Sequence, residues 1–141
     1  MRTIRRWTAA QQFTLAAALA LVVGSLAPWL DFSPGGPFHG GGDYVNGVET
    51  NAGALTFALG AIAVWLLNRP AGPRAAVTSG GIAALALLAG GLVLVTLLQR
   101  LGDDPYQPSW GLWLSAAAVV GMLVGVFLIE TGSGETLSPP D

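Results

Sequence analysis

Four long uncharged stretches alternate with short polar segments along this chain. They cover residues 8–30, 52–68, 75–98 and 110–129, and none of them contains Asp, Glu, Lys, Arg or His. A helix rises 1.5 Å per residue, so about 20 apolar residues cross the ~30 Å hydrocarbon core of a bilayer. The pattern therefore predicts an all-α membrane protein, in which residues 1–130 form one bundle of four antiparallel transmembrane helices.

Composition supports this class and excludes others. Hydrophobic residues make up 52% of the chain and charged residues only 10%, whereas a soluble domain carries roughly 25% charged residues. The net charge of -2 gives no reason to expect a nucleic-acid partner. Cysteine is absent, which excludes disulfides and thiolate metal sites. Lysine is absent too, and this usage, rich in Ala and Gly, is typical of a prokaryotic protein.

The arginines predict an orientation. Five of the six lie in the N-terminal segment or in the turn between the second and third spans, and only Arg100 lies on the other side. The positive-inside rule then predicts a multi-pass protein of the cell (plasma) membrane with both termini in the cytoplasm. The loop 31–51 is expected outside the cell, and the polar tail 131–141 is expected to be a disordered cytoplasmic segment.

The first span also has features of a signal peptide, with arginines ahead of an apolar run. The best small-residue cleavage site, Ser25–Ala27, is followed by Pro28, which is a poor residue after a cleavage point. We therefore expect a retained first helix.

The loop between the first two spans carries a turn signal. Asn46-Gly47 lies between short β-prone runs, and this dipeptide favours the type I′ turn of a β-hairpin. The sequence therefore predicts a small extracytoplasmic hairpin over residues 43–50, preceded by a glycine-rich lead.

Two motifs of the first half suggest a relationship. Pro28-Trp29-Leu30 closes the first span, and the run VNGVETNAGALTF leads into the second. In these motifs the chain resembles small four-span membrane proteins found in archaea and actinobacteria. The resemblance implies four helices and brings no assigned activity, cofactor or catalytic residue.

Small residues recur at helical spacing in three of the spans. In lipid, helices associate through close backbone approach at such residues. They are expected to form helix-packing contacts within the bundle or an interface with another copy or another protein: Ala16, Ala20, Gly24, Ala86, Gly90, Gly121 and Gly125.

Each span also carries a hydroxyl residue at a similar depth below the outer boundary: Ser25, Thr56, Thr96 and Ser115. They could form a hydrogen-bonded layer between helices or the floor of a vestibule. Alternatively, each hydroxyl bonds a carbonyl one turn back on its own helix.

The outer loop contains weak candidates for metal ligands, namely Asp31, His39, Asp43 and Glu49. Their spacing matches no established motif, and acids outside a membrane are usually solvated. We therefore expect neither a metal site nor a cofactor.

Function is constrained mainly by what the spans lack. Ion-coupled transporters usually keep an ionisable group at membrane depth, and intramembrane proteases need a catalytic set that these spans do not contain. We therefore expect no enzymatic activity.

The leading expectation is a scaffold or accessory subunit that binds partner proteins in the bilayer or through its outer loop. The alternatives are an oligomeric passive pore or carrier lined by hydroxyls and, more weakly, an outer-surface metal or ligand sensor.

Overall fold

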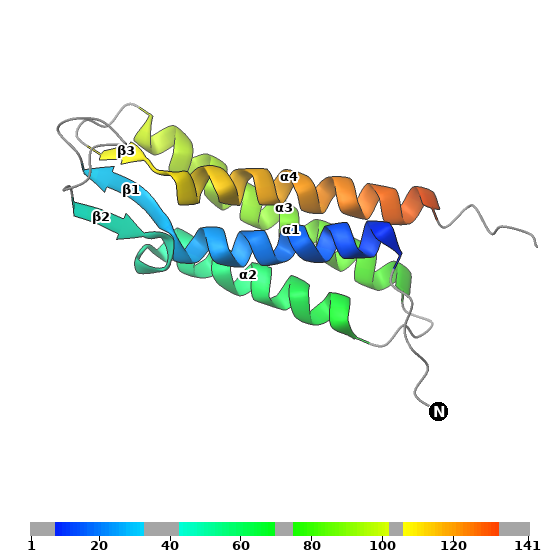
Figure 1. Cartoon of the computed structure of the whole chain (residues 1–141). Helices are drawn as coiled ribbons and strands as arrows, with labels where there is room; N and C mark the ends of the chain where they lie inside the picture. Colours follow the sequence, from blue (N-terminus) through cyan, green and yellow to red (C-terminus); the bar gives the residue numbers. More distant parts are fainter. Residues whose placement is uncertain (1–7, 33–42, 70–74, 102–105, 133–141) are drawn as a thin grey trace, which may run out of the picture.

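Four long helices dominate the computed structural model, which describes residues 8–32, 43–69, 75–101 and 106–132. They are α1 (Ala9–Leu26), α2 (Asn51–Asn68), α3 (Ala75–Arg100) and α4 (Trp110–Gly132) (Figure 1). All four are long and apolar enough to cross a membrane. The predicted set of four apolar helices is therefore confirmed.

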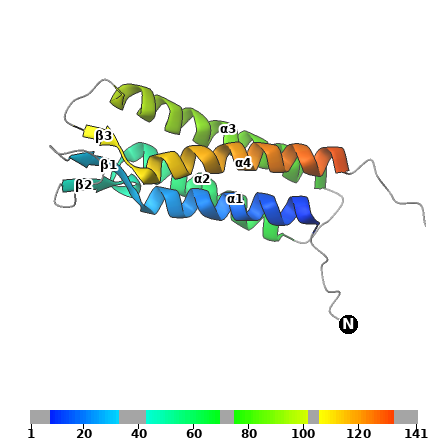
Figure 2. The same cartoon turned by 45° about the horizontal axis from the view of Figure 1, so that its top comes forward.

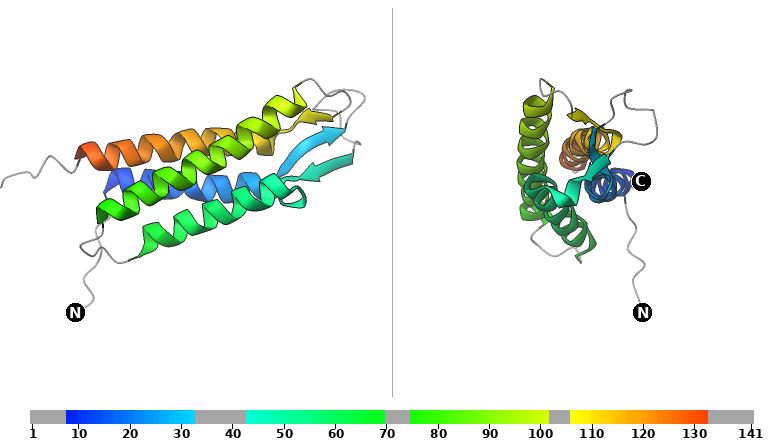
Figure 3. Two further views of the ribbon diagram at one scale, coloured as in Figure 1. Left: turned by 180° about the vertical axis from the view of Figure 1, so that it is seen from behind. Right: turned by 90° about the vertical axis from the view of Figure 1, so that its left-hand side faces the viewer.

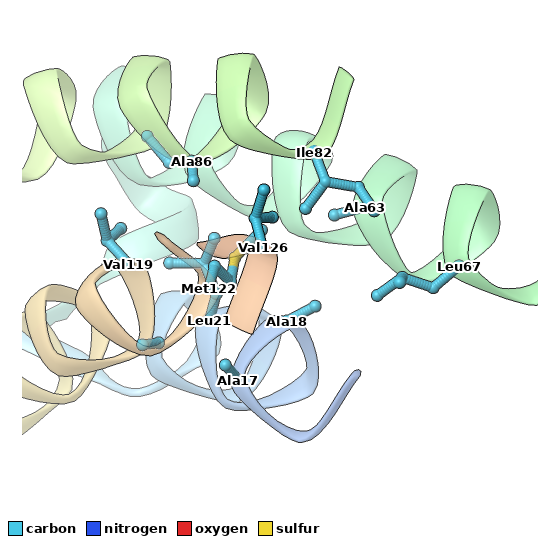
Figure 4. Packing of buried hydrophobic residues seen from close by; sticks show 12 residues of the cluster. Ala17, Ala18, Leu21, Ala63, Leu67, Ile82, Ala86, Val119, Met122 and Val126 are labelled. Carbon is cyan, nitrogen blue, oxygen red and sulfur yellow. The ribbon is translucent and has the colours of Figure 1, made fainter. Parts of the chain in front are cut away.

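The helices form a bundle in which sequence neighbours pack together. α1 packs against α2 and most extensively against α4, and α3 completes the arrangement by packing against α2 and α4 (Figures 1 and 2). The shared core is built largely from small and medium side chains (Figure 4): Ala17, Ala18, Leu21, Ala63, Leu67, Ile82, Ala86, Ala89, Ala118, Val119, Met122 and Val126. Such side chains allow the helix axes to approach closely.

The outward faces of the bundle are apolar as well. Leu87 and Phe127 are each 64% exposed, and Leu88, Leu98 and Val120 are exposed to a similar extent. Exposing so many large apolar side chains to water is unfavourable, whereas lipid chains would cover them. This surface is what a multi-pass membrane protein requires.

A small antiparallel sheet lies at one end of the bundle. We call this end of the bundle the sheet end. Its strands are β1 (Pro28–Phe32), β2 (Asp43–Asn46) and β3 (Tyr106–Pro108), in the order β2-β1-β3. Leu30 of β1 lies opposite Val45 on one side and Pro108 on the other. The opposite end, where α1 begins and α4 ends, is called the distal end (Figure 1).

The hairpin predicted over residues 43–50 is wrong, although its first arm is a strand. That arm, β2, pairs with β1 instead, so the antiparallel pair joins residues 28–32 to residues 43–46. Asn46 has extended backbone angles (φ -69°, ψ 151°) and precedes a short 3-10 helix, η1 (Gly47–Glu49). The Glu49 carboxylate accepts a hydrogen bond from the Asn46 backbone N–H at 2.9 Å. This local cap, together with the packing of Gly47 described below, overrides the turn preference of the dipeptide.

The first helix ends at Leu26, before the expected boundary at Leu30. Ala27 is extended (φ -78°, ψ 164°), and Pro28 has no backbone N–H to continue a helical ladder. The residues up to Leu30 are apolar because they are buried as a strand, which hydropathy alone does not distinguish from a helix.

The other helix boundaries lie near the expected ones. α2 begins at Asn51 with Thr50 as its N-cap, whose side-chain oxygen accepts from the Gly53 N–H at 3.0 Å. α3 and α4 extend beyond the expected ends, to Arg100 and Gly132. Most of the tail, residues 133–141, lies outside the described residues.

Candidate functional site

Trp29 anchors the sheet to the bundle. Its side chain is fully buried, and its indole Nε1–H donates a hydrogen bond to the carbonyl oxygen of Gly24 at 2.9 Å. The last carbonyls of a helix have no donor within the helix, and here a buried side chain provides one. The carbonyl oxygen of Trp29 accepts from the backbone N–H of Ser109 at 2.7 Å. One residue therefore joins the end of α1, the central strand and the start of α4.

Gly47 fills the space between the end of α1 and the Trp29 ring. Its N–H donates to the carbonyl oxygen of Ala27 at 3.0 Å. A Cβ at this position would overlap the carbonyl oxygen of Ser25 and lie 2.5 Å from Trp29 Nε1. Only glycine allows this backbone to approach so closely.

Two further glycines close the same end. A Cβ on Gly53 would overlap the backbone of Gly47, and one on Gly111 would lie 2.6 Å from the carbonyl oxygen of Pro28. Sequence reasoning did not select Gly53 or Gly111, and it selected Gly47 only as part of a predicted turn. The available signal was a glycine just inside each predicted helix start, where it offers no advantage to the helix itself.

Buried side chains then fill the sheet end of the bundle. The cluster contains Trp29, Leu30, Val93 and Leu112, with Val45, Ala52, Leu97 and Ala116 packed against it. It draws on β1, β2, α2, α3 and α4, so segments that are distant in sequence form one platform (Figure 2). We call this unit of the three strands, η1 and the cluster the sheet platform.

At two positions along the α1–α4 interface, a glycine of one helix lies against a hydroxyl side chain of the other. A Cβ on Gly24 would lie 2.6 Å from Ser115 Oγ, and one on Gly125 would overlap Thr14 Oγ1. Between them, a Cβ on Gly121 would lie 3.1 Å from the Cβ of Ala17. The GxxxG face of α4 is therefore covered by α1, which supports packing within the chain over docking of a partner on this motif.

The remaining predicted small residues divide between core and surface. Ala86 is fully buried, and Ala20 packs against the core. Gly90 lies against Val119, whose Cγ1 would be 2.9 Å from an added Cβ. Ala16 is exposed, so its prediction as a packing residue within the bundle is wrong. The buried stripe of α1 runs through Ala17 and Ala18, which the small-residue spacing alone could not distinguish.

The four predicted hydroxyls are satisfied locally. Ser25, Thr56, Thr96 and Ser115 each donate to the carbonyl four residues earlier on the same helix, at 2.8 or 2.9 Å. Three of them are fully buried and Thr96 is partly buried. Of the two alternatives, the geometry is that of the bond one turn back.

Thr14 is a further buried hydroxyl that sequence reasoning missed. It is fully buried and donates to the carbonyl oxygen of Ala10 at 2.8 Å. Across the described residues, every buried side-chain nitrogen or oxygen has a hydrogen-bond partner. The buried polar groups in this part of the chain are therefore committed to structure.

Of the four candidate metal ligands, the structure describes only the side chain of Glu49. His39 lies outside the described residues, as do the side chains of Asp31 and Asp43. The Glu49 carboxylate caps η1 through the Asn46 N–H. Within the described ranges no group of three or more His, Cys, Asp or Glu side chains is placed to hold a metal ion.

Comparisons of the chain with family models, with curated proteins and with solved structures give no match. The resemblance to small four-span membrane proteins of archaea and actinobacteria therefore stays a prediction.

Proposed function

We propose that this protein is a non-enzymatic membrane scaffold or accessory subunit that binds a partner protein through its sheet platform. The chain has four helices apolar enough to cross a membrane, and a small sheet is packed against one end of them. The helices hold the chain in the bilayer, and the platform provides a defined surface at its edge.

The observation that carries the proposal is how firmly the platform is fixed. Two antiparallel helices can be joined by a few residues, yet here residues 27–50 separate α1 from α2 and include two strands and η1. Buried hydrogen bonds from Trp29 and backbone contacts at Gly47 hold these strands against the helix ends. A connection alone does not require strands fixed to the helix ends in this way, whereas a recognition surface does.

An oligomeric pore lined by hydroxyls is less well supported. Ser25, Thr56 and Ser115 are fully buried within one chain and bonded to their own helices. Hydroxyls in that position do not line a path between copies.

The proposed orientation keeps the arginine-rich distal end in the cytoplasm and the platform outside the cell.

The test is co-purification of the full-length chain from its native membranes in a mild detergent. We expect a partner at fixed stoichiometry, visible by native mass spectrometry. Asn51, the first residue of α2, lies two residues after η1 and is exposed beside the platform. Asn51→Arg is expected to reduce partner recovery at least about tenfold, because a mismatched charge at an interface costs several kcal/mol.

Thr131→Arg is the matched control, since it introduces the same side chain at an exposed residue of the distal end. It is expected to leave partner recovery unchanged. Equal recovery with both variants, or a chain that purifies only by itself, would refute the proposed role of the platform.

A further inference from the structure

α2 stops short of the other three helices at the distal end. Figures 1 and 3 both show this, since α1, α3 and α4 extend beyond the last turn of α2. Gly60 of α2 lies against Val22 of α1, whose Cγ2 would be 3.1 Å from an added Cβ. Both helices rise about 1.5 Å per residue, so following α2 from Gly60 to Asn68 leads to the level of Thr14.

The same level can be found on α4, because Gly125 lies against Thr14. Past this level the α4 surface remains apolar through Phe127 (64% exposed) and Leu128 (44% exposed), and its first acid is Glu130. The apolar surface of the bundle therefore extends further on the α4 side than on the α2 side.

The end of α2 carries groups that favour the membrane interface. Asn68 is exposed, and the guanidinium of Arg69 lies 4.0 Å from the ring centre of Trp65. Trp65 is itself 56% exposed. A tryptophan paired with an arginine is stable where headgroups meet acyl chains and unfavourable in the hydrocarbon.

We propose that the bilayer leaflet at the distal end is thinned beside α2. The hydrocarbon layer is then thinner next to α2 than next to α4. α2 has 18 residues, about 27 Å of helix against a hydrocarbon core of ~30 Å. Lipid adjusts to a short span by local thinning. The inference rests on the membrane placement proposed above and adds an asymmetric lipid boundary to it.

The test uses spin labels, because the native chain contains no cysteine. Single-cysteine variants of the full chain are labelled with a nitroxide in phosphatidylcholine bilayers with 18-carbon monounsaturated acyl chains. Depth is measured by collision with oxygen and with a water-soluble nickel chelate. Asn68→Cys is expected at headgroup level. Leu128→Cys is expected deeper by about 3 Å, the rise of the two residues that separate it from Glu130, although it lies further along the bundle axis.

Two controls separate the explanations. Leu55→Cys and Trp113→Cys, at exposed positions near the sheet end, are expected at matching depths. A deeper Leu55 label with a shallower Trp113 label would mean that the whole bundle is tilted, and would overturn local thinning. So would a Leu128 label as shallow as the Asn68 label. A nickel-accessible label at Leu87→Cys, in the middle of α3, would instead refute the membrane placement itself.

Discussion

The seam between α1 and α4 makes a sharp prediction about Gly24. In Gly24→Ala, the new Cβ would lie 2.6 Å from Ser115 Oγ, 3.0 Å from the Ser115 nitrogen and 3.2 Å from the Gly111 carbonyl oxygen, whereas ordinary contact begins at 3.4 Å. Two of these atoms belong to the backbone, so a rotamer change cannot relieve the overlap. The two helices must separate, and overpacking of this kind costs about 1–3 kcal/mol.

The closest of the three atoms belongs to the Ser115 side chain. A second substitution at Ser115 can therefore separate the clash with this side chain from the clashes with the backbone. Ser115→Ala removes Oγ and its bond to the Gly111 carbonyl, and we expect this change alone to cost less than about 1 kcal/mol. In the double variant the remaining contacts are only a few tenths of an ångström short. We therefore expect a favourable coupling of about 0.5–2 kcal/mol between the two substitutions.

The assay is reversible unfolding in mixed micelles of increasing SDS fraction, followed by tryptophan fluorescence. Gly91→Ala is the matched control, because nothing lies within 4 Å of its added Cβ. It is expected to be neutral or slightly stabilising, since alanine favours helix. Equal unfolding midpoints for Gly24→Ala and Gly91→Ala would refute the packing argument, and a strictly additive double variant would refute the role of Ser115.

Three further variants test the sheet end in the same assay. Trp29→Phe removes the indole hydrogen bond to Gly24 and is expected to destabilise the protein by about 1–2 kcal/mol. Trp113→Phe, at a residue 52% exposed, serves as its control. Equal effects of the two substitutions would contradict the anchor role of Trp29. Gly47→Ala places a Cβ against a backbone carbonyl and the buried indole, so we expect about 2–4 kcal/mol of destabilisation; a neutral result would mean that η1 is not held in this position. Thr56→Val removes a hydroxyl bonded only to its own helix and is expected to change stability by less than about 0.6 kcal/mol, whereas a larger loss would indicate a bond between helices.

The number and type of the long elements could be read directly from the chain. Charge-free runs of spanning length leave a membrane helix as the favoured structure, because backbone groups in lipid must be bonded within the segment. The Thr50 cap of α2 depends on local chemistry alone, since its side chain bonds the Gly53 N–H three residues further on. These features depend on residues close together in sequence.

Contacts between distant residues decided the rest. The apolar run through Leu30 was expected to be helix, yet its last part is a buried strand paired on both sides. Asn46-Gly47 has the composition of a turn, but the packing of Gly47 on Trp29 places it at the start of η1. Spacing identified small residues on α1 without showing that Ala16 faces outward.

Local sequence therefore determined which segments are suited to cross a bilayer, because lipid offers the backbone no hydrogen-bond partners and each segment must satisfy its own polar groups. Only the tertiary structure decided where the chain leaves the helix, which glycines are required and which face of each helix is buried. Those properties arise from close approach of segments separated by many residues, and β3 illustrates the point, since three residues from the α3–α4 connection complete a sheet that begins after α1.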